Sequence, residues 1–271
     1  MKVAILFFGI AAILYLAVLA VFFFTQRSLL YYRTHNYVPL AESDSNKAFT
    51  EISVKTADGI DLKGWYAPAK NKQFTIVFFH GNADRLLTAA QIADPYISAG
   101  YGFLLAEYRG YSGLPGTPTE AGLYADGRAY ISKLLAQGVQ ERNIILFGHS
   151  LGTGVAIQMA GEFHVGGLML LAPYLSIPKV AAKHLPLIPV GLLALDRFEN
   201  ARKIRFIRAP LLIANGSEDR IVPPAQGREL FALANKPKEL HTFAKRGHND
   251  LFDDFTPLSL DWINRVCAAH G

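Results

Sequence analysis

The chain has 271 residues, which allows one large or two small domains with a buried core, and its 51% hydrophobic content is typical of a globular protein that carries a membrane segment. The net charge of +5 comes from scattered Lys and Arg residues without long basic runs, so we interpret it as a solvated surface and expect no nucleic-acid partner. The single cysteine, Cys267, excludes an intramolecular disulfide, and no His or Cys cluster has metal-ligand spacing, so we expect neither a metal nor a cofactor.

An uncharged stretch runs from Val3 to Phe24. As a helix that rises about 1.5 Å per residue, it would reach just across the roughly 30 Å hydrocarbon core of a bilayer. A cleaved signal peptide is an alternative, but a cut after Ala20 would leave Val21-Phe22-Phe23-Phe24 as the new terminus. A core helix is disfavoured because no face of the segment is polar. We therefore expect residues 1–25 to be an uncleaved single-pass anchor, and basic residues on both sides leave its orientation open.

A mixed connector, residues 26–48, follows the anchor and contains a Tyr31-Tyr32 pair that suits the level of the lipid headgroups. Apolar and polar residues then alternate from Thr50 to Thr56, Asp58-Gly59 turns the chain, and Ile60 to Tyr66 returns. This pattern predicts an antiparallel hairpin at one edge of a sheet.

Buried strands alternate with helices through the rest of the chain, residues 49–271. The predicted strands are Phe74–Phe79, Gly102–Glu107, Asn143–Phe147, Gly167–Leu171, Pro210–Ala214 and Glu239–Phe243. The predicted helices are Leu86–Ser98, Thr119–Leu135, Leu151–Phe163, Ala225–Ala234 and Phe255–Ala268. This order indicates an α/β fold whose mostly parallel central sheet is covered by helices on both faces.

The alternation breaks between residues 174 and 204. The segment is apolar and interrupted by prolines, as in His184-Leu185-Pro186-Leu187-Ile188-Pro189. It stands where a short cap over an active site would be inserted. The alternative is an ordinary crossover helix that packs its apolar face on the core, and the sequence does not decide between the two.

A Gly-x-Ser-x-Gly pentapeptide, Gly148-His149-Ser150-Leu151-Gly152, joins a predicted strand to a predicted helix. Side chains at Gly148 or Gly152 would collide with the neighbouring strand and helix in such a tight turn. The pentapeptide alone occurs often by chance, but its place between strand and helix is that of a nucleophile elbow.

A serine nucleophile needs a base to remove its proton and a carboxylate to orient that base. In the fold that carries this elbow, the acid and then the histidine follow the serine along the chain. Asp219 lies on the loop after the strand that ends near Gly216, and His248 follows the last predicted strand. Each residue alone has an ordinary structural explanation, but their order and placement together predict Ser150, Asp219 and His248 as nucleophile, acid and base.

An oxyanion hole in this fold uses two backbone N–H groups. We assign one to Leu151, directly after the nucleophile, and the other to Asn82, on the loop after the first buried strand. His80 and His149 flank these turns and are expected to be packed rather than to act chemically. Arg109 is expected to hold loops together.

These features resemble those of membrane-anchored α/β-hydrolase-domain proteins, whose relatives include eukaryotic protein depalmitoylases and many bacterial hydrolases. The resemblance covers nearly the whole chain and rests on Gln26-Arg27-Ser28-Leu29-Leu30-Tyr31, Asp58-Gly59, Gly64-Trp65-Tyr66, Phe79-His80-Gly81-Asn82-Ala83, Tyr108-Arg109-Gly110-Tyr111, the Ser150 pentapeptide, Asp196-Arg197-Phe198, Asp219-Arg220-Ile221-Val222-Pro223 and Gly247-His248-Asn249-Asp250. It implies an α/β-hydrolase fold and the same nucleophile, acid and base. Ser112-Gly113-Leu114-Pro115-Gly116 departs from the family, which usually has Gly-x-Ser-x-Gly there.

The expected activity is that of a serine hydrolase of the carboxylesterase or thioesterase type, which cleaves acyl esters or thioesters through an acyl-enzyme. A serine peptidase of the same fold and a non-catalytic, membrane-tethered binding module are the alternatives. The apolar stretch Leu185 to Leu195, next to a membrane anchor, leads us to expect a small-molecule or lipid-like substrate whose medium or long chain runs along it. If those residues pack on the core instead, short esters should be preferred.

Overall fold

The computed structural model describes residues 2–33, 48–70, 73–82 and 86–270. Its centre is an eight-stranded sheet in the order β1-β2-β4-β3-β5-β6-β7-β8. The strands are β1 (Thr50–Lys55), β2 (Asp61–Ala67), β3 (Thr75–Phe79), β4 (Gly102–Ala106), β5 (Ile144–His149), β6 (Gly167–Leu171), β7 (Leu211–Gly216) and β8 (Lys238–Phe243). β1 and β2 run antiparallel to each other, β2 runs antiparallel to β4, and the strands from β4 to β8 are parallel.

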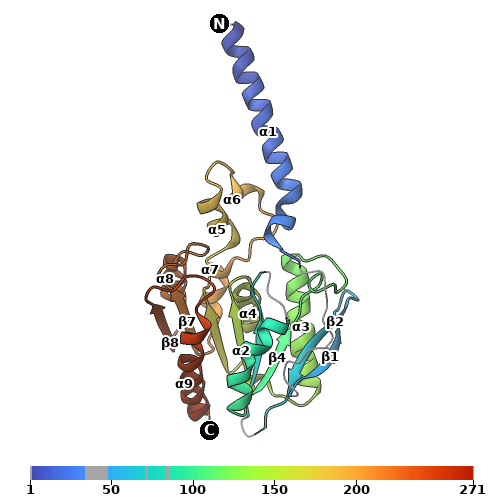
Figure 1. Ribbon diagram of the computed structural model, residues 1–271, viewed down its shortest axis with the longest axis vertical. Coiled ribbons are helices and arrows are strands. Elements are labelled where there is room, and N and C mark those ends of the chain that lie inside the picture. The colour runs from blue at the N-terminus through green and yellow to red at the C-terminus, as the bar shows by residue number, and fades with distance from the viewer. Residues whose placement is uncertain (1, 34–47, 71–72, 83–85, 271) are drawn as a thin grey trace.

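Helices lie on both faces of this sheet (Figure 1). They are α2 (Leu86–Ser98), α3 (Glu120–Ala136), α4 (Leu151–Glu162), α5 (Ile177–His184), α6 (Val190–Leu193), α7 (Asn200–Lys203), α8 (Pro224–Leu233) and α9 (Phe252–His270). One buried cluster joins one sheet face to α3, α4 and α8, and a second joins the other face to α2 and α9. The central strands are buried on both sides, which explains their continuous apolar sequences.

The N-terminal helix α1 (Lys2–Leu30) projects away from the body of the protein (Figure 1). It continues past residue 25, where the connector is predicted to begin, and residues 34–47 of that connector lie outside the described part. Of the Tyr31-Tyr32 pair expected at headgroup level, Tyr32 is exposed but Tyr31 is not available to headgroups. Its side chain is only 2% exposed and belongs to the protein core, because the end of α1 packs against the domain.

The segment 174–204 contains α5, α6 and α7. α7 packs against α4, as a crossover helix does. α5 and α6 instead stand beyond the sheet, on the same side as α1 (Figure 1). The segment therefore combines features of both predicted arrangements.

Candidate active site

The turn between β5 and α4 holds Ser150 in a backbone conformation that residues other than glycine rarely adopt, with φ of 49° and ψ of −117°. Its N–H donates to the carbonyl of Leu171 at 2.9 Å. A Cβ on Gly152 would overlap the carbonyl of Phe79, and one on Gly148 would lie 2.7 Å from the carbonyl oxygen of Gly152. The two glycines are thus needed for the close approach of helix and strand that presents the serine.

The structure brings the three residues predicted as nucleophile, acid and base into one hydrogen-bonded chain. The Nε2 atom of His248 lies 2.8 Å from Ser150 Oγ, and its Nδ1 atom lies 2.6 Å from Asp219 Oδ2. The other carboxylate oxygen of Asp219 accepts the N–H groups of Ile221 and Val222 at 2.9 and 2.8 Å. With Asp219 ionised, Nδ1 carries the proton of the neutral imidazole and Nε2 is left to accept the serine proton.

Hydrogen bonds between the loops after β7 and β8 fix this geometry. The N–H of Glu218 donates to the carbonyl of Arg246 at 2.8 Å, and the N–H of Lys245 donates to Ser217 Oγ at 2.9 Å. A Cβ on Gly216 would overlap the carbonyl of Arg246, so the histidine loop crosses directly over the end of β7. The neighbouring carboxylate, Glu218, is exposed, whereas Asp219 is buried.

The two groups predicted to hold an oxyanion come from adjacent strands. β3 and β5 pair in parallel with Phe79 opposite Gly148, so the loop after β3 lies beside the serine turn. Leu151 begins α4, and helix geometry leaves its N–H without an intrahelical acceptor. The Asn82 side-chain oxygen accepts both the Tyr32 N–H and the Tyr111 hydroxyl at 2.8 Å. These contacts hold the loop that carries the Asn82 N–H.

A buried pair, His80 and Glu107, supports the same loop. His80 Nε2 lies 2.7 Å from Glu107 Oε1, and its Nδ1 lies 2.7 Å from the carbonyl of Gly81. The second oxygen of Glu107 accepts the Ser112 hydroxyl at 2.6 Å. His80 is therefore packed, as predicted, but the role of Glu107 was missed. The available signal was a carboxylate at the end of a strand that is otherwise apolar.

His149 and Arg109 also occupy structural positions. The ring of His149 is buried. Its centroid lies 5.5 Å from that of the His248 ring and 4.9 Å from that of the Phe252 ring. Arg109 pairs with Asp126 at 2.8 Å and Asp58 at 2.5 Å, which joins α3 to the hairpin turn as predicted. Burial raises the pKa of Asp126 to about 6, whereas Arg109 holds the pKa of Asp58 below its usual range.

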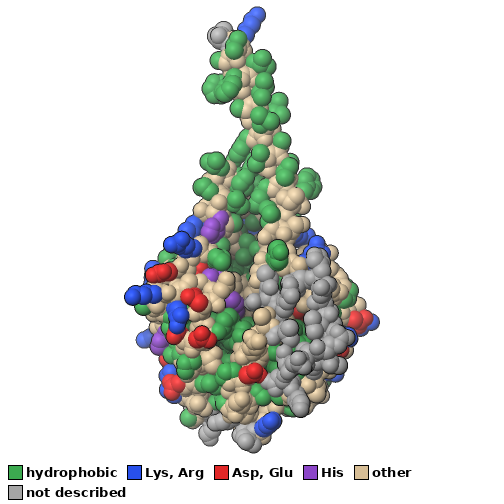
Figure 2. All heavy atoms as spheres, viewed as in Figure 1, with side chains coloured by type: hydrophobic (Ala, Val, Ile, Leu, Met, Phe, Trp, Pro, Cys, Tyr) green, Lys and Arg blue, Asp and Glu red, His purple; other side chains and the backbone are tan. Residues whose placement is uncertain are grey.

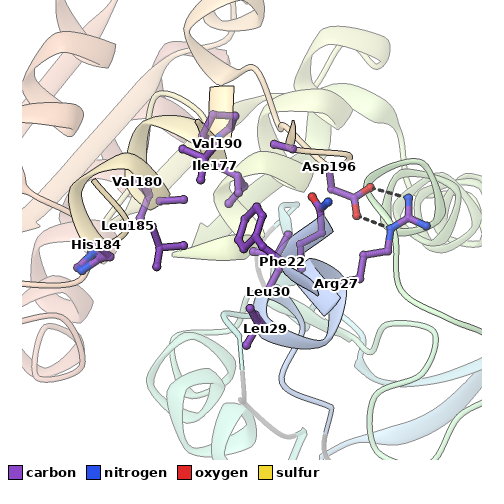
Figure 3. A pocket seen from close by; sticks show the side chains of 14 residues that line it. Phe22, Arg27, Leu29, Leu30, Ile177, Val180, His184, Leu185, Val190 and Asp196 are labelled. Atoms are coloured by element: carbon purple, nitrogen blue, oxygen red, sulfur yellow. Dashed lines mark hydrogen bonds and ion pairs between the residues drawn. The ribbon is translucent and has the colours of Figure 1, made fainter. Parts of the chain in front are cut away.

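An apolar cavity of about 230 Å³ lies between α1 and the segment 174–204. Figure 3 shows Phe22 and Leu30 of α1 on one side and Val180 and Leu185 on the other. At its edge Arg27 Nε donates to the buried carboxylate of Asp196 at 2.8 Å. Among the described residues, no group of three or more His, Cys, Asp or Glu side chains is arranged to hold a metal ion.

Comparisons with known proteins agree with this architecture. Residues 70–201 match the family described as serine aminopeptidase, S33. An uncharacterized protein of Mycobacterium tuberculosis is 36% identical over 83% of this chain and 81% of its own length. The human alpha/beta hydrolase domain-containing protein 17B is 31% identical over 67% of this chain and 62% of its own.

A crystal structure of an esterase from Pyrococcus furiosus superposes with a TM-score of 0.68 at 15% identity, covering 88% of this chain and 96% of the esterase. At that identity the similarity shows the fold alone, and it confirms the predicted fold class. The sequence matches, together with this fold, show that the chain belongs to the α/β-hydrolase family.

Proposed function

We propose that this α/β hydrolase is a serine hydrolase that cleaves carboxylic ester or thioester bonds of acyl substrates. The observation that carries the proposal is the hydrogen-bonded chain of Ser150, His248 and Asp219, with contacts of 2.8 and 2.6 Å. A serine aligned with a histidine, which is in turn held by a buried carboxylate, is the arrangement that activates a hydroxyl for acyl transfer.

In the first half of the proposed reaction, Ser150 Oγ attacks the substrate carbonyl while His248 Nε2 takes its proton. The Asp219 carboxylate stabilises the resulting imidazolium. The N–H groups of Leu151 and Asn82 bind the oxyanion, a contribution of roughly 3 to 4 kcal/mol for one donor in related sites. His248 then gives the proton to the departing alcohol or thiol, which leaves an acyl group on Ser150.

In the second half, His248 removes a proton from water as the water oxygen attacks the acyl-enzyme. The tetrahedral intermediate collapses, the proton returns to Ser150 Oγ, and the carboxylic acid departs. Several solved structures of the same fold are described as esterases, which supports esters as the substrate class.

We further propose that α1 anchors the enzyme in a membrane. Its most apolar window has a mean hydropathy of 2.8 and no buried residue, so the protein itself does not cover this helix. Full-length protein should stay in the membrane fraction after carbonate washing. Release by carbonate, or a mature N-terminus beyond Ala20, would show that the segment is not an anchor.

A panel of p-nitrophenyl esters of increasing chain length, run beside aminoacyl p-nitroanilides, tests the activity. We expect ester turnover that a fluorophosphonate abolishes. Faster turnover of the anilides would favour the peptidase alternative. Absence of turnover and of fluorophosphonate labelling would leave a binding module.

A further inference from the structure

The outer part of the segment 174–204 is apolar and exposed. From Leu185 to Leu195 no side chain is charged or carries a hydrogen-bonding group. Leu187 and Leu192 are 81% and 87% exposed. Contiguous apolar surface of this kind on a soluble protein marks contact with a partner or with lipid. We call Leu185–Leu195 the apolar loop.

The apolar loop runs alongside α1. The Gln26 side chain donates to the carbonyl of Leu193 at 3.1 Å and accepts the N–H of Leu195 at 2.9 Å. Further toward the N-terminus, the Tyr15 hydroxyl donates to the carbonyl of Leu187 at 2.8 Å. At about 1.5 Å per residue, the helix from Gln26 to Tyr15 is roughly 16 Å long, about half of a 30 Å hydrocarbon core. If α1 spans a bilayer, Leu187 lies deep within one leaflet.

The backbone of the apolar loop suits that environment, where unpaired N–H groups are costly. The N–H groups of Ile188, Val190 and Leu192 donate to carbonyls of the same loop at 3.1, 2.7 and 2.9 Å. Pro186 and Pro189 have no N–H to satisfy. Most of the loop's polar backbone is therefore occupied without water.

Charged residues flank the apolar loop, and from its C-terminal side Arg197 donates to the carbonyl of Gly191 at 2.8 Å. Lys179 and Lys183 are exposed on α5, and His184 ends that helix. Figure 2 shows basic side chains and a histidine where the mostly hydrophobic projection meets the body of the protein, on the face in view. Cationic side chains at this level suit an anionic headgroup layer, with the apolar loop beyond it in hydrocarbon.

Two contacts link α1 and the segment 174–204, which form the cavity, to the loops of the serine site. On one side, Tyr32, just after α1, contacts Asn82. On the other, His184 Nε2 lies 3.0 Å from the carbonyl of Ile221, two residues beyond Asp219. The cavity of about 230 Å³ falls below the roughly 300 to 1,000 Å³ of ordinary ligand pockets, so it suits part of a chain rather than a whole lipid.

We propose that the apolar loop is inserted in the membrane and that the cavity beneath it binds the acyl chain of a substrate that remains in the leaflet. This rests on the proposed serine hydrolase activity and on the anchor. It also revises the predicted chain path: Leu187 and Leu192 face outward, whereas Leu185 and Val190 line the cavity with residues of α1.

Depth-dependent quenching tests the insertion. The full chain carrying Leu187→Trp is reconstituted in phosphatidylcholine and phosphatidylglycerol vesicles whose acyl chains are brominated. The native Trp65 and Trp262 are 0% and 2% exposed and give a constant background. Phe206→Trp is the matched control. Phe206 is 80% exposed but precedes β7, so it lies near the amino ends of the parallel strands, whereas Ser150 follows the carboxyl end of β5.

We expect brominated lipid to remove most of the emission added by Leu187→Trp, with a blue-shifted maximum, and to leave that of Phe206→Trp unchanged. No quenching at Leu187, or equal quenching at both positions, would overturn the insertion. The readout needs no turnover, so it stands even if the protein is not a serine hydrolase.

Substitutions in α5 test the acyl-chain cavity. Ala181 lines the cavity, whereas its neighbour Ala182 is exposed and does not. Ala181→Phe should lower the ratio of octanoate to acetate ester turnover about tenfold, as expected if two methylene groups are no longer buried. Ala182→Phe should leave the ratio as in wild type. If a fluorophosphonate labels the wild type but the ratio is unchanged in Ala181→Phe, the cavity does not bind the acyl chain. If the wild type is not labelled, the proposed hydrolase activity itself is rejected.

Discussion

The serine site and the layer formed by α1 and the apolar loop place their polar and apolar groups in opposite ways. Around Ser150, polar atoms are aligned by specific partners in a mostly buried setting, as with the 2.6 Å contact of His248 and Asp219. In the outer layer, large apolar side chains such as Leu187 are exposed, and the polar contacts hold the backbone. The comparison places the proposed reaction chemistry and the proposed lipid contact on separate segments, which meet at the contacts of Asn82 and Ile221.

Removing the nucleophile should break only the first region. We expect Ser150→Ala to reduce ester turnover roughly 10⁴- to 10⁶-fold, because the acyl-enzyme can no longer form. The melting temperature in detergent should change little, since the alanine keeps the same backbone conformation. The matched variant Ser53→Ala removes an exposed hydroxyl on β1, far along the sheet from the serine turn, and should retain wild-type activity. Equal losses in both variants would contradict the assignment.

The acid can be told from its neighbour in the same way. Asp219→Asn should cost about 10⁴-fold in turnover, because an amide in contact with Nδ1 favours the wrong imidazole tautomer. Glu218→Gln should be mild, since that carboxylate is exposed. Initial rates with a short p-nitrophenyl ester measure both. The opposite ranking would move the acid to Glu218.

Two glycines of α4 measure how tightly the serine turn is packed. A Cβ at Gly152 would overlap the Phe79 backbone, so Gly152→Ala should cost more than the roughly 1 to 3 kcal/mol typical of overpacking. A Cβ at Gly161 meets nothing within 4 Å, and Gly161→Ala should stabilise the helix by about 0.5 kcal/mol. Thermal melts of both variants measure the two effects. Similar melting temperatures for the two variants would be inconsistent with the packing described.

A small effect should come from the ion pair that joins α1 to the segment 174–204. The Arg27 side chain is 42% exposed, so its coupling to Asp196 should be at most about 1 kcal/mol. A double-mutant cycle with Arg27→Gln and Asp196→Asn, measured by thermal unfolding, gives the coupling directly. Asp196→Asn alone should cost more, because its carboxylate is buried and also accepts the N–H of Glu120 at 2.9 Å. A coupling of several kcal/mol would contradict the treatment of Arg27 as a partly solvated partner.

Much of the first region was predictable from sequence because its signals are local. The strands are short apolar runs, and a serine, an aspartate and a histidine each follow a predicted strand in the order the fold requires. A carboxylate at the end of an apolar strand marks Glu107 as unusual, but its pairing with His80 was not predictable, because the two residues follow different strands.

The second region was less predictable for a physical reason. Leu187 and Val190 look alike in sequence, yet one is 81% exposed and the other is 3% exposed. Hydrophobic pattern alone does not tell a side chain covered by protein from one left for lipid. The burial of Tyr31 likewise depends on how α1 meets the domain, which no local pattern records.

The central claim is that Ser150 is the nucleophile of an acyl-transfer site. The most direct measurement is peptide mass spectrometry of the full-length protein after reaction with a fluorophosphonate. We predict one covalent adduct, located on the peptide that contains Ser150, and its loss in Ser150→Ala. An adduct on a different residue, or ester hydrolysis that persists when Ser150 is unmodified, would contradict the claim.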